Sequence, residues 1–136
     1  MKTAGDRLLR NKRILIAEDD MILAFDLIVT LRQAGAEIVG PAATLKQALS
    51  LVKTPLLSAA VLDVNLGDEE VFPAASALEV LGVGIVFYTG YILSDLGRIW
   101  PKAQVLSKPA PPSLLIKAVS QACGLHAQFG AVSPIS

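Results

Sequence analysis

The chain has 136 residues and a mass of 14.3 kDa, which fits one compact domain that needs no disulfide or metal staple. Its formal net charge is zero, so whole-molecule electrostatic attraction to nucleic acid is not expected. Hydrophobic residues make up 53% of the chain, but no apolar run approaches the length of a membrane span. The single cysteine, Cys123, excludes an internal disulfide and fits a reducing compartment. We therefore expect a cytoplasmic protein without membrane insertion or direct nucleic-acid binding.

The N-terminal part of the chain predicts a basic lead-in followed by a strand, a loop and a helix. Residues 1–11 are rich in lysine and arginine and lack the apolar core of a secretion signal, so we expect them to be frayed. Residues 13–17 form a continuous apolar run that suits a strand buried on both faces. Helical spacing follows over residues 21–34, where Asp20 caps the start and Gly35 ends the helix.

The next stretch predicts a second strand and a second helix. Residues 36–40 read as a short strand ended by Pro41, and residues 44–47 have the form of a capping box. Pro55 helps to stop the helix that follows. The apolar face of that helix is expected to hold Leu45, Ala48, Leu49 and Val52.

The middle of the chain predicts a third strand over residues 58–62, a loop over residues 63–70 and a helix over residues 71–81. Acidic residues favour the positive N-terminus of a helix, and the loop ends in three of them, which are Asp68, Glu69 and Glu70. The residues of this helix expected to face inward are Ala74, Ala75, Leu78 and Leu81.

The C-terminal part predicts two more strands, over residues 84–88 and 105–107. Between them, residues 92–99 favour a helix of about two turns that Gly97 weakens, so we expect a short, mobile element. A last helix begins near residues 111–113 and ends at Gly124, and residues 124–136 are expected to form a tail. Trp100 and Pro101 are expected either to form an exposed apolar patch or to cover the edge of the sheet.

Alternating strands and helices predict right-handed crossovers and a parallel sheet with helices on both faces. In such folds the carboxyl ends of the strands meet at one edge, where ligands bind. Four of the predicted strands are followed directly by polar residues, which we call the strand-end signals: Glu18-Asp19-Asp20, Asp63, Thr89 and Lys108. Carboxylates hold a hard cation such as Mg²⁺, and a hydroxyl and an ammonium neutralise phosphate oxygens. The pattern therefore indicates metal-assisted chemistry on a phosphoryl group.

Each signal also has a plain structural interpretation. Glu18, Asp19 and Asp20 are typical of a solvated helix start, and Asp63 before Asn65 and Gly67 is typical of a turn. Thr89 alone fits a helix cap, Lys108 alone fits a surface lysine, and His126 lies beyond the last predicted helix. None of these interpretations explains why the signals end different strands.

Taken together, residues 13–20, 61–66, 87–91 and 106–109 closely resemble the receiver domain of two-component response regulators. The resemblance covers residues 12–123. It implies an α/β, flavodoxin-like (βα)5 fold, a three-layer sandwich around a five-stranded parallel sheet of order 2-1-3-4-5.

The resemblance also implies a role for each site residue. Asp63 would accept a phosphoryl group from a phosphohistidine, and Glu18 and Asp19 would position Mg²⁺ together with Asp63. Asn65 would offer a backbone carbonyl to the metal. Thr89 would hydrogen-bond the phosphoryl group and Lys108 would pair with it, next to a cis bond between Lys108 and Pro109.

Two departures from the family pattern point to a subfamily. Val105 stands where most members carry an aromatic residue, three positions before the lysine. The string Phe87-Tyr88-Thr89-Gly90-Tyr91 instead resembles stand-alone alphaproteobacterial receivers with a Phe-Ala-Thr-Gly-x-Tyr-like motif. Tyr91 would then take over the aromatic switching role, or would simply rest against the core.

The resemblance implies a single-domain response regulator, a monomer or weak dimer, that is not an enzyme beyond its own phosphorylation and dephosphorylation. Its donor would be a sensor histidine kinase or a phosphotransfer protein, and it would signal to a downstream protein or drain phosphate. One alternative is a Mg²⁺-dependent phosphatase, but such enzymes need a second acid where Asn65 stands. Another is a receiver-like binding module that never turns over phosphate.

Overall fold

The computed structural model describes residues 8–90 and 95–132, with side chains described as far as Gly124 in the last helix. Its main sheet is parallel and five-stranded, in the order β2-β1-β3-β6-β7. Counted along the chain, these strands have the predicted order 2-1-3-4-5. The strands of this sheet are β1 (Arg13–Ala17), β2 (Glu37–Ala42), β3 (Ala59–Leu62), β6 (Gly84–Thr89) and β7 (Gln104–Ser107).

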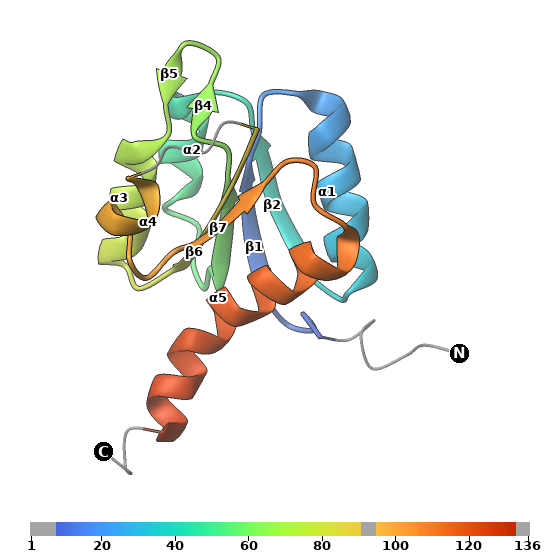
Figure 1. Ribbon diagram of the computed structural model, residues 1–136, viewed down its shortest axis with the longest axis vertical. Coiled ribbons are helices and arrows are strands. Elements are labelled where there is room, and N and C mark those ends of the chain that lie inside the picture. The colour runs from blue at the N-terminus through green and yellow to red at the C-terminus, as the bar shows by residue number, and fades with distance from the viewer. Residues whose placement is uncertain (1–7, 91–94, 133–136) are drawn as a thin grey trace.

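Helices cover both faces of the sheet, which gives the predicted three layers (Figure 1). They are α1 (Met21–Gln33), α2 (Leu45–Leu51), α3 (Phe72–Val80), α4 (Leu96–Ile99) and α5 (Pro112–Val132). One core cluster joins the sheet to α2, α3 and α4, and the other joins it to α1 and α5. Alternate side chains of each buried strand enter opposite clusters, as strand geometry requires. Leu15 and Phe87 lie in the first cluster, and Ile16 and Tyr88 lie in the second.

Both ends of the folded domain extend beyond the predicted bounds of 12 and 123. Leu9 is fully buried and its backbone N–H donates to Ala34 O at 2.8 Å, so this part of the expected lead-in is anchored to the domain by one residue rather than frayed. Residues 1–7 lie outside the described part of the chain. At the other end, α5 continues to Val132 through the expected tail. A glycine such as Gly124 lowers helix propensity but does not by itself end a helix.

The second strand continues past the proline that was expected to end it. Pro41 lies inside β2, which is the edge strand of the sheet, where a missing N–H donor is tolerated. The pairing register with β1 shifts at this point, between Leu15 and Ala17. Gly40 has a φ of 108°, and a Cβ there would lie 2.7 Å from Ile16 O. A glycine is therefore required beside the proline.

The predicted loop over residues 63–70 contains a short antiparallel hairpin, formed by β4 (Asn65–Leu66) and β5 (Glu69–Glu70). Asp68, Glu69 and Glu70 therefore belong to the hairpin and not to the first turn of α3, which holds no acidic residue. The interpretation of these acids as first-turn partners of the helix dipole is wrong, because Glu69 and Glu70 pair with Leu66 and Asn65 and Asp68 lies in the turn between the strands.

Two leucines expected inside the core are exposed. Leu49 on α2 is 38% exposed, and Leu51 is the half-buried residue instead. Leu81 is 62% exposed because α3 ends at Val80 and Leu81 serves as its C-cap. Short helices offer too few turns for the apolar periodicity to fix such end positions.

The segment before β7 contains a helix of four residues, α4, so the expected two turns are too many. Trp100, which caps its C-terminus, is 8% exposed and lies 5.4 Å from Phe87 and 6.0 Å from Phe72, measured between ring centroids. The expected exposed patch is therefore wrong for Trp100, which is buried and packs over β6, the strand next to the sheet edge.

Candidate functional site

The predicted site residues follow four strands of the sheet, at its carboxyl edge. Glu18 and Asp19 follow β1, Asp63 follows β3, Thr89 ends β6 and Lys108 follows β7. Because the four strands are parallel and adjacent, the fold brings these ends together, next to the β4–β5 hairpin (Figure 1).

Three carboxylates converge at this edge. One oxygen from each of Glu18, Asp19 and Asp63 lies within 4.8 Å of the others. Asp19 is exposed, whereas the Glu18 and Asp63 side chains are 2% and 12% exposed. Like charges at such separations repel, so the cluster favours a positive partner.

Lys108 supplies one positive charge to the cluster. Its Nζ donates to Glu18 Oε1 and, at 2.6 Å, to Asp63 Oδ2. Burial alone would lower the pKa of the Lys108 ammonium, but its hydrogen bonds to Asp63 and Glu18 outweigh burial and raise that pKa above 10.5. The lysine is therefore a permanent cation in this site at neutral pH.

Glu18 is held in place although burial opposes its charge. Burial raises the pKa of the Glu18 carboxyl, and the hydrogen bond from Lys108 and another from the Asp20 backbone N–H at 3.0 Å oppose that rise. One ammonium offsets only part of the charge of three carboxylates. An all-oxygen donor set with uncompensated negative charge fits a hard divalent cation such as Mg²⁺.

Thr89 lies at the end of β6, next to the lysine. It is 1% exposed and is paired with Ser107 in the sheet register. Its carbonyl accepts the backbone N–H of Lys108 at 2.9 Å. The bond between Lys108 and Pro109 is cis, as the family resemblance predicted. The structure thus ties the backbone of Lys108 to the end of the neighbouring strand.

Two further predictions, for Asn65 and Tyr91, stay predictions. Asn65 is exposed in β4, and its backbone N–H lies 3.4 Å from Asp63 Oδ1. It lies two residues beyond Asp63, and a carbonyl contact with a metal stays a prediction. Tyr91, the expected switch residue, lies outside the described residues.

Sequence reasoning missed two residues that contact the site. The Tyr88 hydroxyl accepts the backbone N–H of Ala110 at 3.0 Å, and its ring centroid lies 5.9 Å from Lys108 Nζ. The Gly67 N–H donates to Asp19 Oδ2 at 2.8 Å. A buried tyrosine hydroxyl signals a need for a partner, but the sequence does not show which backbone group meets it.

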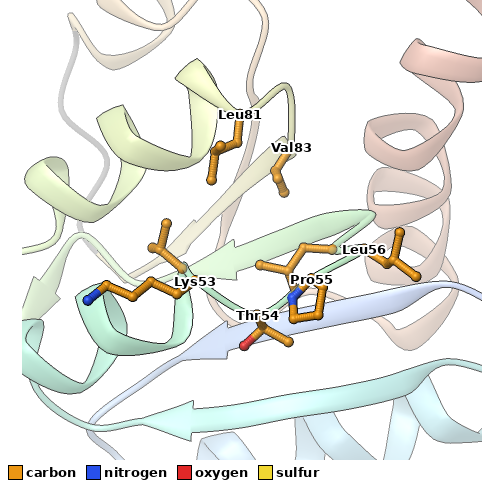
Figure 2. A pocket seen from close by; sticks show the side chains of 8 residues that line it. Lys53, Thr54, Pro55, Leu56, Leu81 and Val83 are labelled. Carbon is orange, nitrogen blue, oxygen red and sulfur yellow. The ribbon is translucent and has the colours of Figure 1, made fainter.

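A groove of about 490 Å³ lies at the opposite end of the sheet (Figure 2). Its residues precede the amino ends of β3 and β6, so it is not part of the carboxyl-edge site. The residues that line it are Val52, Lys53, Thr54, Pro55, Leu56, Leu57, Leu81 and Val83.

The single cysteine offers no site. Cys123 lies on α5 and packs in the core cluster between α1, α5 and the sheet, and burial raises the pKa of its thiol to about 11, so it is not a reactive thiol at neutral pH. The side chain of His126 lies outside the described part of the chain. Among residues 8–90 and 95–132, no helix combines the length and hydrophobicity that crossing a membrane requires.

Comparisons with solved structures bear on the fold. A response regulator receiver protein from Sinorhizobium medicae superimposes with a TM-score of 0.76 at 25% identity, covering 85% of this chain and 97% of that one. A CheY-like receiver domain protein from Methanospirillum hungatei gives a TM-score of 0.77 at 24% identity, covering 88% and 98%. The chain has a response regulator receiver fold.

Comparison with curated proteins found relatives over most of this chain. The transcriptional regulatory protein PdtaR of Mycobacterium tuberculosis is 32% identical over 115 residues, which are 82% of this chain and 56% of that protein. This chain spans about half the length of the curated relatives it matches. No family model matches the chain.

Proposed function

We propose that this receiver domain accepts a phosphoryl group on Asp63 from a sensor histidine kinase or a phosphotransfer protein. Mg²⁺ would be its cofactor, and the phosphorylated domain would signal by protein contact or act as a phosphate sink. The observation that carries the proposal is the joint placement of Asp63 with Lys108 and the acidic pair. Lys108 Nζ lies 2.6 Å from Asp63 Oδ2, and the carboxylates of Glu18 and Asp19 adjoin that of Asp63.

Asp63 is the nucleophile of the proposed transfer. One of its carboxylate oxygens forms a bond to phosphorus as the bond from phosphorus to the donor imidazole nitrogen breaks, which leaves an acyl phosphate. Mg²⁺, when bound by Glu18, Asp19 and Asp63, supplies charge neutralisation on the phosphoryl oxygens. Water can later attack the acyl phosphate and return the carboxylate.

Lys108 and Thr89 would bind the oxygens of the phosphoryl group once it is on Asp63. The Lys108 ammonium already contacts Asp63, so a phosphoryl group on that residue brings its oxygens within reach of the same cation. Thr89 ends the strand adjacent to β3 and would donate its hydroxyl proton to another oxygen. The negative charge added by the transfer is thus shared among groups that the fold already holds in place.

An exposed apolar face beside the site supports contact with a protein donor. Helix α1 begins three residues after Glu18, and the apolar residues it exposes are Met21, Ile22, Phe25 and Val29. Ile22 and Phe25 are 77% and 66% exposed. An apolar patch next to charged chemistry is typical of a protein interface.

The finer assignment is to a stand-alone receiver of the Phe-Ala-Thr-Gly-x-Tyr type that works in the cytoplasm. Thr89, Gly90 and Tyr91 support it in sequence, and Val105 at the usual aromatic position agrees with it. Val105 is half-buried and packs against the core cluster that contains α3 and α4. Because it is a valine, it offers no aromatic ring beside Thr89.

The test is intact-mass measurement after incubation with Mg²⁺ and acetyl phosphate. The wild-type protein should gain one phosphoryl group, because Asp63 offers the nucleophile and the cluster binds the cation. Asp63→Asn should gain none, and a chelator should stop the reaction. Asp68→Asn is the matched control, because Asp68 is exposed at the tip of the hairpin. Equal labelling of wild type and Asp63→Asn would contradict the proposal.

A further inference from the structure

The β4–β5 hairpin is firmly attached to the core although its tip is exposed. Leu66 in β4 is 2% exposed, and Val64 and Val71 on either side of the hairpin are 1% and 0% exposed. The Val71 N–H donates to Val64 O at 2.8 Å and closes the base of the hairpin. Because its base is anchored in this way, the tip of the hairpin is held in a fixed position relative to the core.

The tip contacts one of the proposed metal ligands. The Gly67 N–H donates to Asp19 Oδ2 at 2.8 Å, across 48 positions of sequence. Asp19 is the exposed member of the acidic cluster, so its side chain has fewer packing contacts to fix it than Glu18 has. A carboxylate has two oxygens, so one can accept from Gly67 while the other faces a cation.

Gly67 can make this contact because of its backbone conformation. Its φ is 64°, and both favoured two-residue hairpin turns require a positive φ at the first central position. A Cβ added at Gly67 would meet nothing within 4 Å. A substitution here therefore acts through the backbone alone, and its effect follows from how well the new residue tolerates a positive φ.

We infer that the hairpin is a positioning device for the metal site, in which the Gly67 amide orients Asp19 as a ligand of Mg²⁺. Gly67 is a positioning residue, since it touches the ligand and not the cation. The inference rests on the metal site of the proposed function. It adds that hairpin backbone geometry, and not the acidic residues alone, sets the affinity for Mg²⁺, since groups that orient a ligand commonly change metal affinity by 10-fold or more.

The experiment compares Gly67→Val with Gly67→Asn by calorimetric titration of the metal-free protein with Mg²⁺ and with Ca²⁺. Both substitutions add a side chain to open space, but asparagine tolerates a positive φ and a β-branched residue does not. We expect Gly67→Val to raise the Kd for Mg²⁺ about tenfold and Gly67→Asn to leave it within about twofold. The Kd for Ca²⁺ should change less than that for Mg²⁺, because Ca²⁺ accepts irregular ligand geometry.

A merely structural role would give a different pattern. It would weaken the binding of both cations equally, whereas a lower melting temperature of the metal-free protein is expected from backbone strain in either case. In an Asp19→Ala background, Gly67→Val should cause no further loss of Mg²⁺ affinity, because the oriented ligand is gone. If Gly67→Val does not fold, Gly67→Ala gives the same comparison with a smaller strain.

The inference is overturned if Gly67→Val binds Mg²⁺ as the wild type does, if Gly67→Asn loses as much affinity, or if the wild type binds no Mg²⁺. A wild type that binds no Mg²⁺ would also contradict the metal cofactor of the proposed function, whereas the two results on the Gly67 variants are separable from that function. If Asp63 is not labelled but the Gly67 variants change the Kd for Mg²⁺ as expected, only the proposed phosphoryl transfer is contradicted. Normal labelling with no effect at Gly67 would contradict only the positioning role.

Discussion

At the scale of residues, the site depends on one lysine placed between two carboxylates. Lys108 contacts Glu18 and Asp63 from a side chain that is 12% exposed. Removing one partner of a buried ion pair leaves an uncompensated charge, which costs more than the pair itself contributes. The lysine therefore stabilises the metal-free protein as well as serving the proposed chemistry.

Lys108→Ala should lower the free energy of unfolding by about 3 kcal/mol in the presence of a chelator. Mg²⁺ should recover part of that loss, because a bound cation replaces the missing positive charge. Urea unfolding with and without Mg²⁺ measures both effects, and Lys46→Ala, at an exposed lysine of α2, is the control. Equal stability of Lys108→Ala and wild type under chelation would contradict the prediction.

The same contact has a defined pH dependence. Since folding raises the pKa of Lys108 above 10.5, its contribution to stability is fully present below pH 10.5. It is lost as the pH rises through the folded-state pKa. The stability difference between wild type and Lys108→Ala should thus be constant from pH 7 to about pH 10 and shrink above that. A difference that already falls between pH 7 and 9 would show that Lys108 is not charged in the folded state.

At the scale of elements, strand ends were predictable and short connections were not. The apolar run before Glu18 and the run before Asp63 each suit one buried strand, and both strands form where predicted. The β4–β5 hairpin was missed because its strands have two residues each, too few for any periodicity. Its turn residue, Gly67, gave a sequence signal for a turn but not for the carboxylate that its N–H meets.

Helix α5 packs against the start of β6 so closely that no side chain fits between them. A Cβ added at Gly84 would lie 2.2 Å from Ala122 O, a backbone atom that cannot move alone. We expect Gly84→Ala to lower the free energy of unfolding by about 3 kcal/mol. Chemical denaturation measures this change, and the control is Gly97→Ala.

The control substitution has the opposite expected sign. Gly97 lies in α4, where an added Cβ meets nothing within 4 Å. Alanine favours a helix over glycine, so Gly97→Ala should raise stability by about 0.5 to 1 kcal/mol. If Gly84→Ala proved as stable as Gly97→Ala, the close approach of α5 to β6 would be excluded.

At the scale of the whole molecule, the rings of Phe72, Phe87 and Trp100 pack together in the core and connect α3 and α4 to the strand that ends at Thr89. Trp100, the single tryptophan, lies 5.4 Å from Phe87, which is two residues before Thr89 on β6. Phosphorylation of Asp63 would add contacts at Thr89 and bias the position of that strand end. The region from Thr89 to Val105 is therefore the expected output surface.

Trp100 should report that change. Its fluorescence should shift when acetyl phosphate and Mg²⁺ are added to the wild type, because the ring packs against the strand that contacts the phosphoryl group. Asp63→Asn should show no shift under the same conditions. A wild type that is labelled on Asp63 but keeps its fluorescence unchanged would place the output surface elsewhere.

The sequence by itself determined the order of strands and helices, and the strand-end positions of Glu18, Asp63, Thr89 and Lys108. It did so because apolar runs of strand length and helical periodicity are local properties. Tertiary structure decided the contacts between sequence-distant groups, such as the Gly67 amide with Asp19 and the Tyr88 hydroxyl with Ala110. Those contacts join backbone groups to side chains, and every residue type except proline carries the same backbone donor and acceptor. Which of them meet is therefore set by packing and not by the pattern of side chains.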